Sequence, residues 1–173
     1  KTIDTLNKCL QANHQLQAMG ISQPDSDYSL IMPESYVGLP FMDVDPPEKE
    51  KRKKEKAAQQ LKAICEDLRE RKTGISHLTE GQLSWFFSHV VGGFFEHVLI
   101  TDKRLHVVEE RCVKCGICAN VCPVGDISGG KGKKPVWLHH DDCLTCFSCY
   151  HHCPHHAIEF GRQTQKKGQY YYK

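Results

Sequence analysis

The chain has 173 residues, 39% of them hydrophobic and 25% charged, an ordinary balance for a soluble protein of one domain or two small ones. Its formal charge of +2 at pH 7 is too small to indicate a polyanionic partner, and no segment is apolar over the roughly 20 positions of a membrane span. No secretory hydrophobic region precedes the first predicted helix, so we expect the cytoplasm or another reducing compartment.

A helix and a short strand are predicted at the start of the chain. Apolar residues recur at helical spacing over residues 2–19, and Gly20 is a suitable C-terminal cap. Residues 28–32 are strand-like and end before Pro33. Cys9 occupies an apolar position of the helix, so we predict that it is buried and behaves as a small hydrophobic residue.

A second predicted helix begins with Asp45 as its N-cap and Pro46 at its first position, and it ends before Thr73 and Gly74. We expect its apolar stripe to be buried, Cys65 included, and the stripe consists of Ala57, Ala58, Leu61, Ile64, Cys65 and Leu68. Its first half, residues 49–56, is strongly basic. We interpret this run as the solvated opening of an exposed helix, with nucleic acid or an anionic membrane as the alternative contacts.

A third helix is predicted from Thr79, which stands in capping-box register with Gln82. Its apolar face is wide, but polar residues on the other side argue against a membrane span. We expect this helix to pack against the rest of the protein or a partner, and peripheral membrane contact through residues 80–99 is the alternative. A strand over residues 105–108 follows, and residues 136–138 match it later in the chain.

The central feature is a run of four cysteines that occurs twice, 31 residues apart, each time followed by proline. This C-x2-C-x2-C-x3-C-P spacing is the pattern that binds two 4Fe-4S clusters, in which the fourth cysteine of each run crosses to the other cluster. The first cluster is therefore predicted to bind to Cys112, Cys115, Cys118 and Cys153. The second is predicted to bind to Cys143, Cys146, Cys149 and Cys122.

The spacing has a physical reason, because three cysteines two residues apart wrap one cubane and the fourth ligand must come from elsewhere. Gly116 suits a backbone that approaches the cluster closely, and Pro123 and Pro154 direct the chain away from it. Zinc is the alternative metal, but a zinc site closes on four ligands and does not explain a three-plus-one pattern used twice. Disulfides are disfavoured by the expected reducing compartment.

Two bound clusters would reverse the sign of the net charge. Eight thiolates and two oxidised cores would bring the formal charge of the holoprotein to about −2. The basicity of the bare sequence therefore gives no reason to expect nucleic acid.

Three histidine pairs lie near the second cysteine run, at residues 139–140, 151–152 and 155–156. Their protonation could make a cluster potential depend on pH. We favour the simpler interpretation of surface histidines, since no spacing typical of a separate metal site is present.

The C-terminal repeat resembles bacterial-type two-cluster ferredoxins, and the chain as a whole resembles the microbial family of flavodoxin–ferredoxin fusions. The wider resemblance is carried by residues 32–36 (MPESY), 134–137 (KPVW), 161–164 (GRQT) and 167–170 (KGQY). It implies a flavodoxin-like domain before the ferredoxin, yet only the last strand and last helix of such a domain are identifiable. We therefore expect a fragment or one half of a split fusion, whose lone strand is completed by another chain. FMN would bind only if that chain supplied the missing half.

The predicted fold class is α+β, with a helical N-terminal segment and one strand followed by a pseudo-twofold ferredoxin-type domain. We expect a partial flavodoxin-like segment at 1–44, a helical connector at 45–104, the two-cluster domain at 105–162 and a basic, Tyr-rich tail at 163–173.

The predicted function is low-potential electron transfer between protein redox partners, as part of a flavodoxin–ferredoxin type relay or as a subunit of a larger redox complex. The alternative is a binding module for nucleic acid or a protein assembly, held together by structural clusters without redox turnover. No nucleophile–base pair or substrate pocket signature indicates a standalone catalyst.

Overall fold

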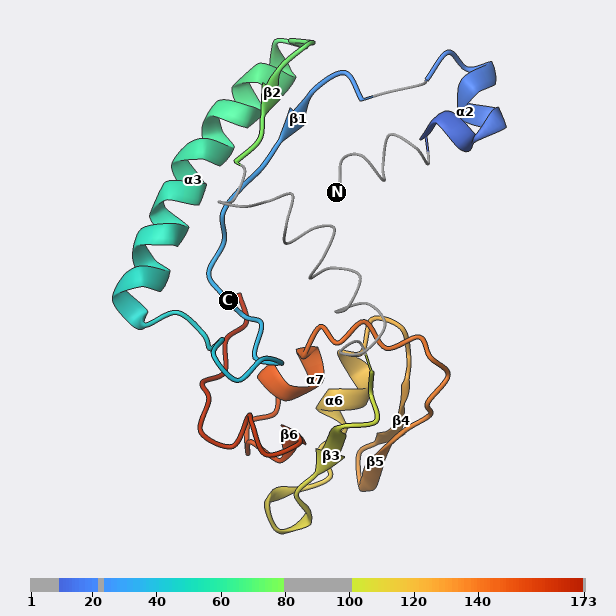
Figure 1. Ribbon diagram of the computed structural model, residues 1–173, viewed down its shortest axis with the longest axis vertical. Coiled ribbons are helices and arrows are strands. Elements are labelled where there is room, and N and C mark those ends of the chain that lie inside the picture. Colours follow the sequence, from blue (N-terminus) through green and yellow to red (C-terminus); the bar gives the residue numbers. More distant parts are fainter. Residues whose placement is uncertain (1–9, 22–23, 80–100, 173) are drawn as a thin grey trace. The chain divides into compact units, whose positions relative to one another are not determined.

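The computed structural model describes residues 10–21, 24–79 and 101–172, and it mixes helices with short strands (Figure 1). The chain forms two compact units. One comprises Lys1–Met32 with Lys51–Val91, and the other comprises Pro33–Glu50 with Gly92–Lys173. The third predicted helix, with the possible peripheral membrane contact through residues 80–99, lies outside the described residues, apart from Thr79. Cys9 lies outside them as well. Within the described ranges, no helix has the length and apolar character needed to cross a membrane.

Among the described residues of the first unit, residues 10–12 are helical, and the short helix α2 (His14–Ala18) follows after Asn13. The predicted helix over 2–19 is interrupted at Asn13, which has an extended backbone. The Asn13 side chain instead caps α2, because its oxygen accepts hydrogen bonds from the amides of Gln15 and Leu16, both at 3.1 Å. An asparagine that can bond to the backbone in this way competes with continuation of the helix.

Helix α3 (Pro47–Arg69) confirms the second predicted helix, although it begins at Pro47 rather than at the predicted Pro46, and Glu48 and Glu50 lie in its first turn. It ends before Arg71 and Gly74, which have left-handed φ values of 55° and 73°. The prediction that Cys65 is buried is wrong, because this side chain is exposed. Of the stripe on this helix, only Ala57 is buried.

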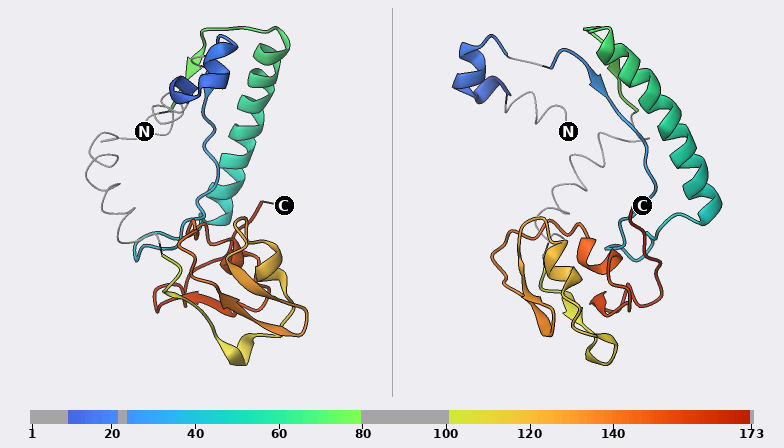
Figure 2. Two further views of the ribbon diagram at one scale, coloured as in Figure 1. Left: turned by 90° about the vertical axis from the view of Figure 1, so that its right-hand side faces the viewer. Right: turned by 180° about the vertical axis from the view of Figure 1, so that it is seen from behind.

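Strand β1 (Asp27–Tyr28) pairs in parallel with β2 (Ser76–His77), so the expectation that this strand lacks a partner in its own chain is wrong. The Tyr28 ring packs edge-on against His77 at 6.0 Å between ring centres. The order β1, α3, β2 makes a strand–helix–strand unit with parallel strands, in which a helix provides the connection (Figure 2). The main argument for completion by a second chain therefore disappears.

The described residues of the second unit include two antiparallel strand pairs and two one-turn helices. Strand β3 (Leu105–Val107), at the predicted position, pairs with β6 (Ile158–Phe160), and β4 (Ile127–Gly130) pairs with β5 (Lys133–Trp137). Helix α6 (Ile117–Asn120) and helix α7 (Ser148–His151) contact each other, and the 3-10 turn η3 (Glu109–Arg111) precedes the first cysteine run. Each short helix starts within a cysteine run, so the fold positions the thiols.

Aromatic residues of the second half form the centre of this unit. Phe147 is almost fully buried and packs edge-to-face against Tyr36 and Phe160, each at 5.3 Å between ring centres, and against Tyr150 at 6.5 Å. Val37 is fully buried in the same cluster. Aromatic residues bury large areas, so this cluster is the main hydrophobic core of the unit.

Two flanking segments complete the second unit, and we name them the strap (residues 33–45) and the tail (residues 161–172). His151 on α7 donates from Nε2 to the Ser35 carbonyl at 2.6 Å, and Lys167 donates to the Val37 carbonyl at 2.9 Å. The Tyr150 hydroxyl donates to the Lys167 carbonyl at 2.8 Å. Strap and tail thus bind both α7 and each other. The division of the chain into segments 1–44, 45–104, 105–162 and 163–173 stays a prediction.

A pair of glycines gives a stability prediction for this unit. Gly116 has a φ of 82°, and a Cβ there would lie 2.7 Å from the carbonyl carbon of Gly130. Gly125 has a φ of 67° but open space around its Cα. We expect Gly125→Ala to cost about 1–2 kcal/mol through left-handed strain alone. Gly116→Ala should cost more, since the backbone of β4 must also move, and chemical denaturation followed by circular dichroism would measure both. Equal costs would contradict the close approach at Gly116.

Candidate iron–sulfur sites

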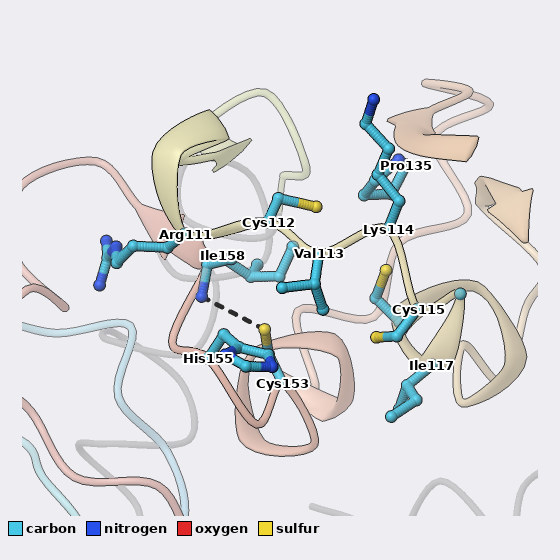
Figure 3. Close-up of a pocket in the computed structure, with 13 residues that line it drawn as sticks. Arg111, Cys112, Val113, Lys114, Cys115, Ile117, Pro135, Cys153, His155 and Ile158 are labelled. Carbon is cyan, nitrogen blue, oxygen red and sulfur yellow. Dashed lines mark hydrogen bonds between the residues drawn. The ribbon is translucent and has the colours of Figure 1, made fainter. Parts of the chain in front are cut away.

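A first pocket of about 350 Å³, open solvent included, is lined by four cysteines from two parts of the chain. Cys112, Cys115 and Cys118 come from the first run, and Cys153 comes from the second (Figure 3). Cys112 follows η3 and Cys118 lies in α6, whereas Cys153 follows α7. The contact between the two short helices therefore brings the fourth thiol to the other three.

A second pocket of the same size is lined by the remaining four cysteines of the two runs. Cys143, Cys146 and Cys149 come from the second run, and Cys122 crosses from the first. The structure thus groups the eight predicted site residues into the two sets that the sequence spacing predicts.

The loops that carry the thiols need left-handed backbone at matching places. Lys114 and Thr145 occupy the same position of the two runs, and both have positive φ, 55° and 44°. Gly116 is matched by Phe147, which has a φ of 59° despite its large side chain. Left-handed backbone is costly for such residues, so the surrounding core must hold Phe147 in place.

Burial differs among the thiols of each set. Cys118, Cys149 and Cys153 are buried, whereas Cys115 and Cys146 are exposed. Burial raises the pKa of the Cys149 thiol well above its usual range, and the nearby Cys146 adds to this effect. Burial likewise raises the pKa of Cys118 and Cys143. Thiols of this kind become thiolates when a metal binds them, which releases their protons.

The donor set fits an iron–sulfur cluster better than a single ion. Among the described residues, no three His, Cys, Asp or Glu side chains converge closely enough to hold one metal ion. Each group of four thiols instead surrounds a hollow. A multi-iron core needs sulfurs spread around a volume, so this arrangement accommodates a 4Fe-4S cluster.

Polar groups contact two of the sulfurs. The Ala157 amide donates to Cys153 Sγ at 3.2 Å, as the dashed line in Figure 3 marks. The Ser148 hydroxyl oxygen lies 3.4 Å from Cys146 Sγ. Hydrogen bonds to cluster sulfurs are one of the means by which a protein adjusts the reduction potential.

One residue of the second pocket escaped the sequence prediction. Asp126 lines that pocket with only 2% of its surface exposed. Neither oxygen of its carboxyl group has a hydrogen-bond partner among the described residues. The repeat contains the signal, since the residue 31 positions later is Ala157, which lines the first pocket. A carboxyl group at one of two matched positions makes the pockets chemically unequal.

The histidines near the second run have different surroundings, so the interpretation of all six as surface residues is wrong for one of them. His151 is buried, donates to Ser35 and accepts a hydrogen bond from the Tyr170 amide at 3.2 Å on Nδ1. Burial lowers the pKa of His151, which agrees with a neutral ring protonated on Nε2. His139 is exposed and lies 2.5 Å from Asp102, and His152 stacks on Tyr171.

Comparison with known proteins gives a consistent result. The sequence model of a family described as the 4Fe-4S dicluster domain matches residues 101–158. The chain is 33% identical over 70 residues to a ferredoxin of Streptomyces griseus, covering 39% of this chain and 65% of that protein. It is 52% identical over 29 residues to a ferredoxin of Megasphaera elsdenii, covering 17% and 54% of the two chains. It is also 34% identical over 53 residues to an uncharacterized protein of the rpl9-rpl11 intergenic region of Porphyra purpurea, covering 28% and 71%.

The chain spans less than two thirds of the length of both ferredoxins that it matches. The matched residues nevertheless include every residue that lines the two pockets. Residues 101–158 therefore belong to the 4Fe-4S dicluster domain family, and the chain contains a ferredoxin-type iron–sulfur domain.

Proposed function

We propose that this protein transfers electrons at low potential between protein redox partners through two 4Fe-4S clusters. The observation that carries the proposal is the crossing of cysteines, in which each pocket takes three thiols from one run and the fourth from the other. This arrangement is that of the two-cluster ferredoxins. The matching positions of α6 with α7 and of β4 with β6 in the repeat support a pseudo-twofold ferredoxin fold.

The residues around the pockets suit electron transfer at the protein surface. Cys115 and Cys146 are exposed, and each has an exposed apolar neighbour, Val113 at 58% and Leu144 at 59%. A partner protein could therefore approach either pocket over a small apolar contact. Each cluster, when bound, supplies one-electron chemistry, while the buried thiols and aromatic core keep water from its inner side.

The remaining features of the proposal concern partners and compartment. We propose a carrier or an electron-transfer subunit, and the reducing compartment stays an expectation from the sequence. A relay that includes FMN would need a flavodoxin-like domain from another chain. The parallel β1–α3–β2 unit is compatible with an α/β origin of the first unit, but the FMN part rests on the family resemblance.

Anaerobic reconstitution of the full chain tests the proposal. We expect about eight irons and eight sulfides per chain, and dithionite should produce the coupled EPR spectrum of two reduced cubanes. A product that holds one or two zinc ions, or clusters that dithionite cannot reduce, would support structural metal sites in a binding module and would contradict electron transfer.

A further inference from the structure

We propose that the rim of the first pocket is the docking surface for an acidic redox protein. The inference rests on the proposed electron-transfer function and specifies the chemistry of one partner. Among the described residues, the first pocket is lined by two cations, Arg111 and Lys114, and by no acidic residue. Arg111 already pairs with the buried Glu159 at 2.7 Å, whereas Lys114 is exposed beside the exposed Cys115 (Figure 3).

The β4–β5 hairpin adds two more lysines to this rim. The Gly132 amide donates to the Lys114 carbonyl at 2.8 Å, so the turn of the hairpin is fixed next to the pocket. Lys131 and Lys133 flank that glycine, and both are exposed. Within the described residues, neither of them nor Lys114 forms an ion pair, and the nearby Glu109 pairs with Lys134. Lys114, Lys131 and Lys133 form what we name the basic rim.

The second pocket has the opposite charge. Asp126 is the only charged residue among those described that line it. The exposed Asp141 and Asp142 directly precede Cys143. An acidic partner is therefore attracted to the first pocket and repelled from the second, which would select the cluster that exchanges electrons with it.

The composition of the basic rim favours a protein over a nucleic acid. Val113 is an apolar residue at 58% exposure that lines the first pocket together with the cations Arg111 and Lys114, and protein–protein interfaces likewise combine an apolar centre with a polar periphery. Proteins that bind single strands stack bases on aromatic side chains. Apart from His155, the residues that line the first pocket in the described part of the chain include no aromatic ring.

A comparison of two protein probes of opposite charge tests the proposal on the reconstituted full chain. Oxidised flavodoxin is the acidic probe and ferric cytochrome c is the basic probe, and each accepts one electron from a reduced cluster, which becomes oxidised. At low salt, the variant K131E/K133E should transfer electrons to flavodoxin on the order of tenfold more slowly than the unaltered chain. Its rate with cytochrome c should not fall.

The control variant R162E/K166E makes the same change in net charge on exposed residues of the tail, which line neither pocket. It should change the flavodoxin rate by less than about twofold, and the effect of K131E/K133E should shrink at high salt because of screening. Equal slowing by both variants, or by neither, would overturn the proposal. So would an oligonucleotide that binds the protein through the basic rim while the flavodoxin rate stays unchanged in K131E/K133E.

Different results would contradict the electron-transfer function and the docking surface. Iron content and EPR spectra of each variant are measured before the rates. A chain without reducible clusters contradicts electron transfer itself, whereas fully loaded and reducible variants with unchanged rates contradict only the docking surface.

Discussion

Replacing Cys153 by serine is expected to remove the cluster of the first pocket and leave that of the second. Iron should fall from about eight to about four per chain, because serine retains the size of the side chain but not the thiolate. Cys153 lies in the second run but lines the first pocket with Cys115. C153S and C115S should therefore leave the same residual EPR spectrum after reduction with dithionite.

The reciprocal variants make the crossing testable. C122S and C146S should leave the other spectrum, since both residues line the second pocket. C65S is the matched control, because this exposed cysteine belongs to neither run, and its iron content should not change. If C153S instead gave the spectrum of C146S, each run would hold its own cluster and the crossed assignment would be wrong.

Truncating Phe147 to alanine is expected to produce the largest loss of stability in the second unit. The side chain is 2% exposed and packs against Tyr36, Tyr150 and Phe160. Removal of such a ring costs about 3–5 kcal/mol of unfolding free energy, because a cavity remains. Anaerobic denaturation of the loaded protein, followed by circular dichroism, would measure the loss.

The same substitution at Phe41 serves as the control, since this residue of the strap is 83% exposed. F41A should change the unfolding free energy by less than about 0.5 kcal/mol. A similar cost for F147A and F41A would show that the aromatic cluster is not the core of the unit.

The cysteine grouping could be predicted because the repeat determines it. Two runs with the same cysteine spacing stand 31 residues apart, and this spacing predicts that the fourth thiol of each run joins the other set. The exposure of Cys65 could not be predicted in this way. An apolar stripe on a helix shows which face could be buried, but not whether the fold covers it.

Long-range contacts account for the other differences. Nothing near Tyr28 indicates that its strand pairs with Ser76 and His77 after a long helix. The burial of His151 likewise depends on Ser35, which is 116 residues away. Asp126 could have been noticed from the repeat, because the matched position 31 residues later holds an alanine. Its burial could be recognised only in the structure.

The strap and tail have a consequence for the order in which the protein is made and loaded. Val37 and Lys167 are 130 residues apart in sequence, yet they form a hydrogen bond that joins strap and tail. Contacts of such separation form late, because the intervening chain must first be closed into a loop. During synthesis, the strap is made before α7 and the tail after it, so α7 lacks its tail contacts until residues up to Tyr170 have left the ribosome. Iron and sulfide are therefore expected to enter the pocket of Cys149 only after the tail has been synthesised.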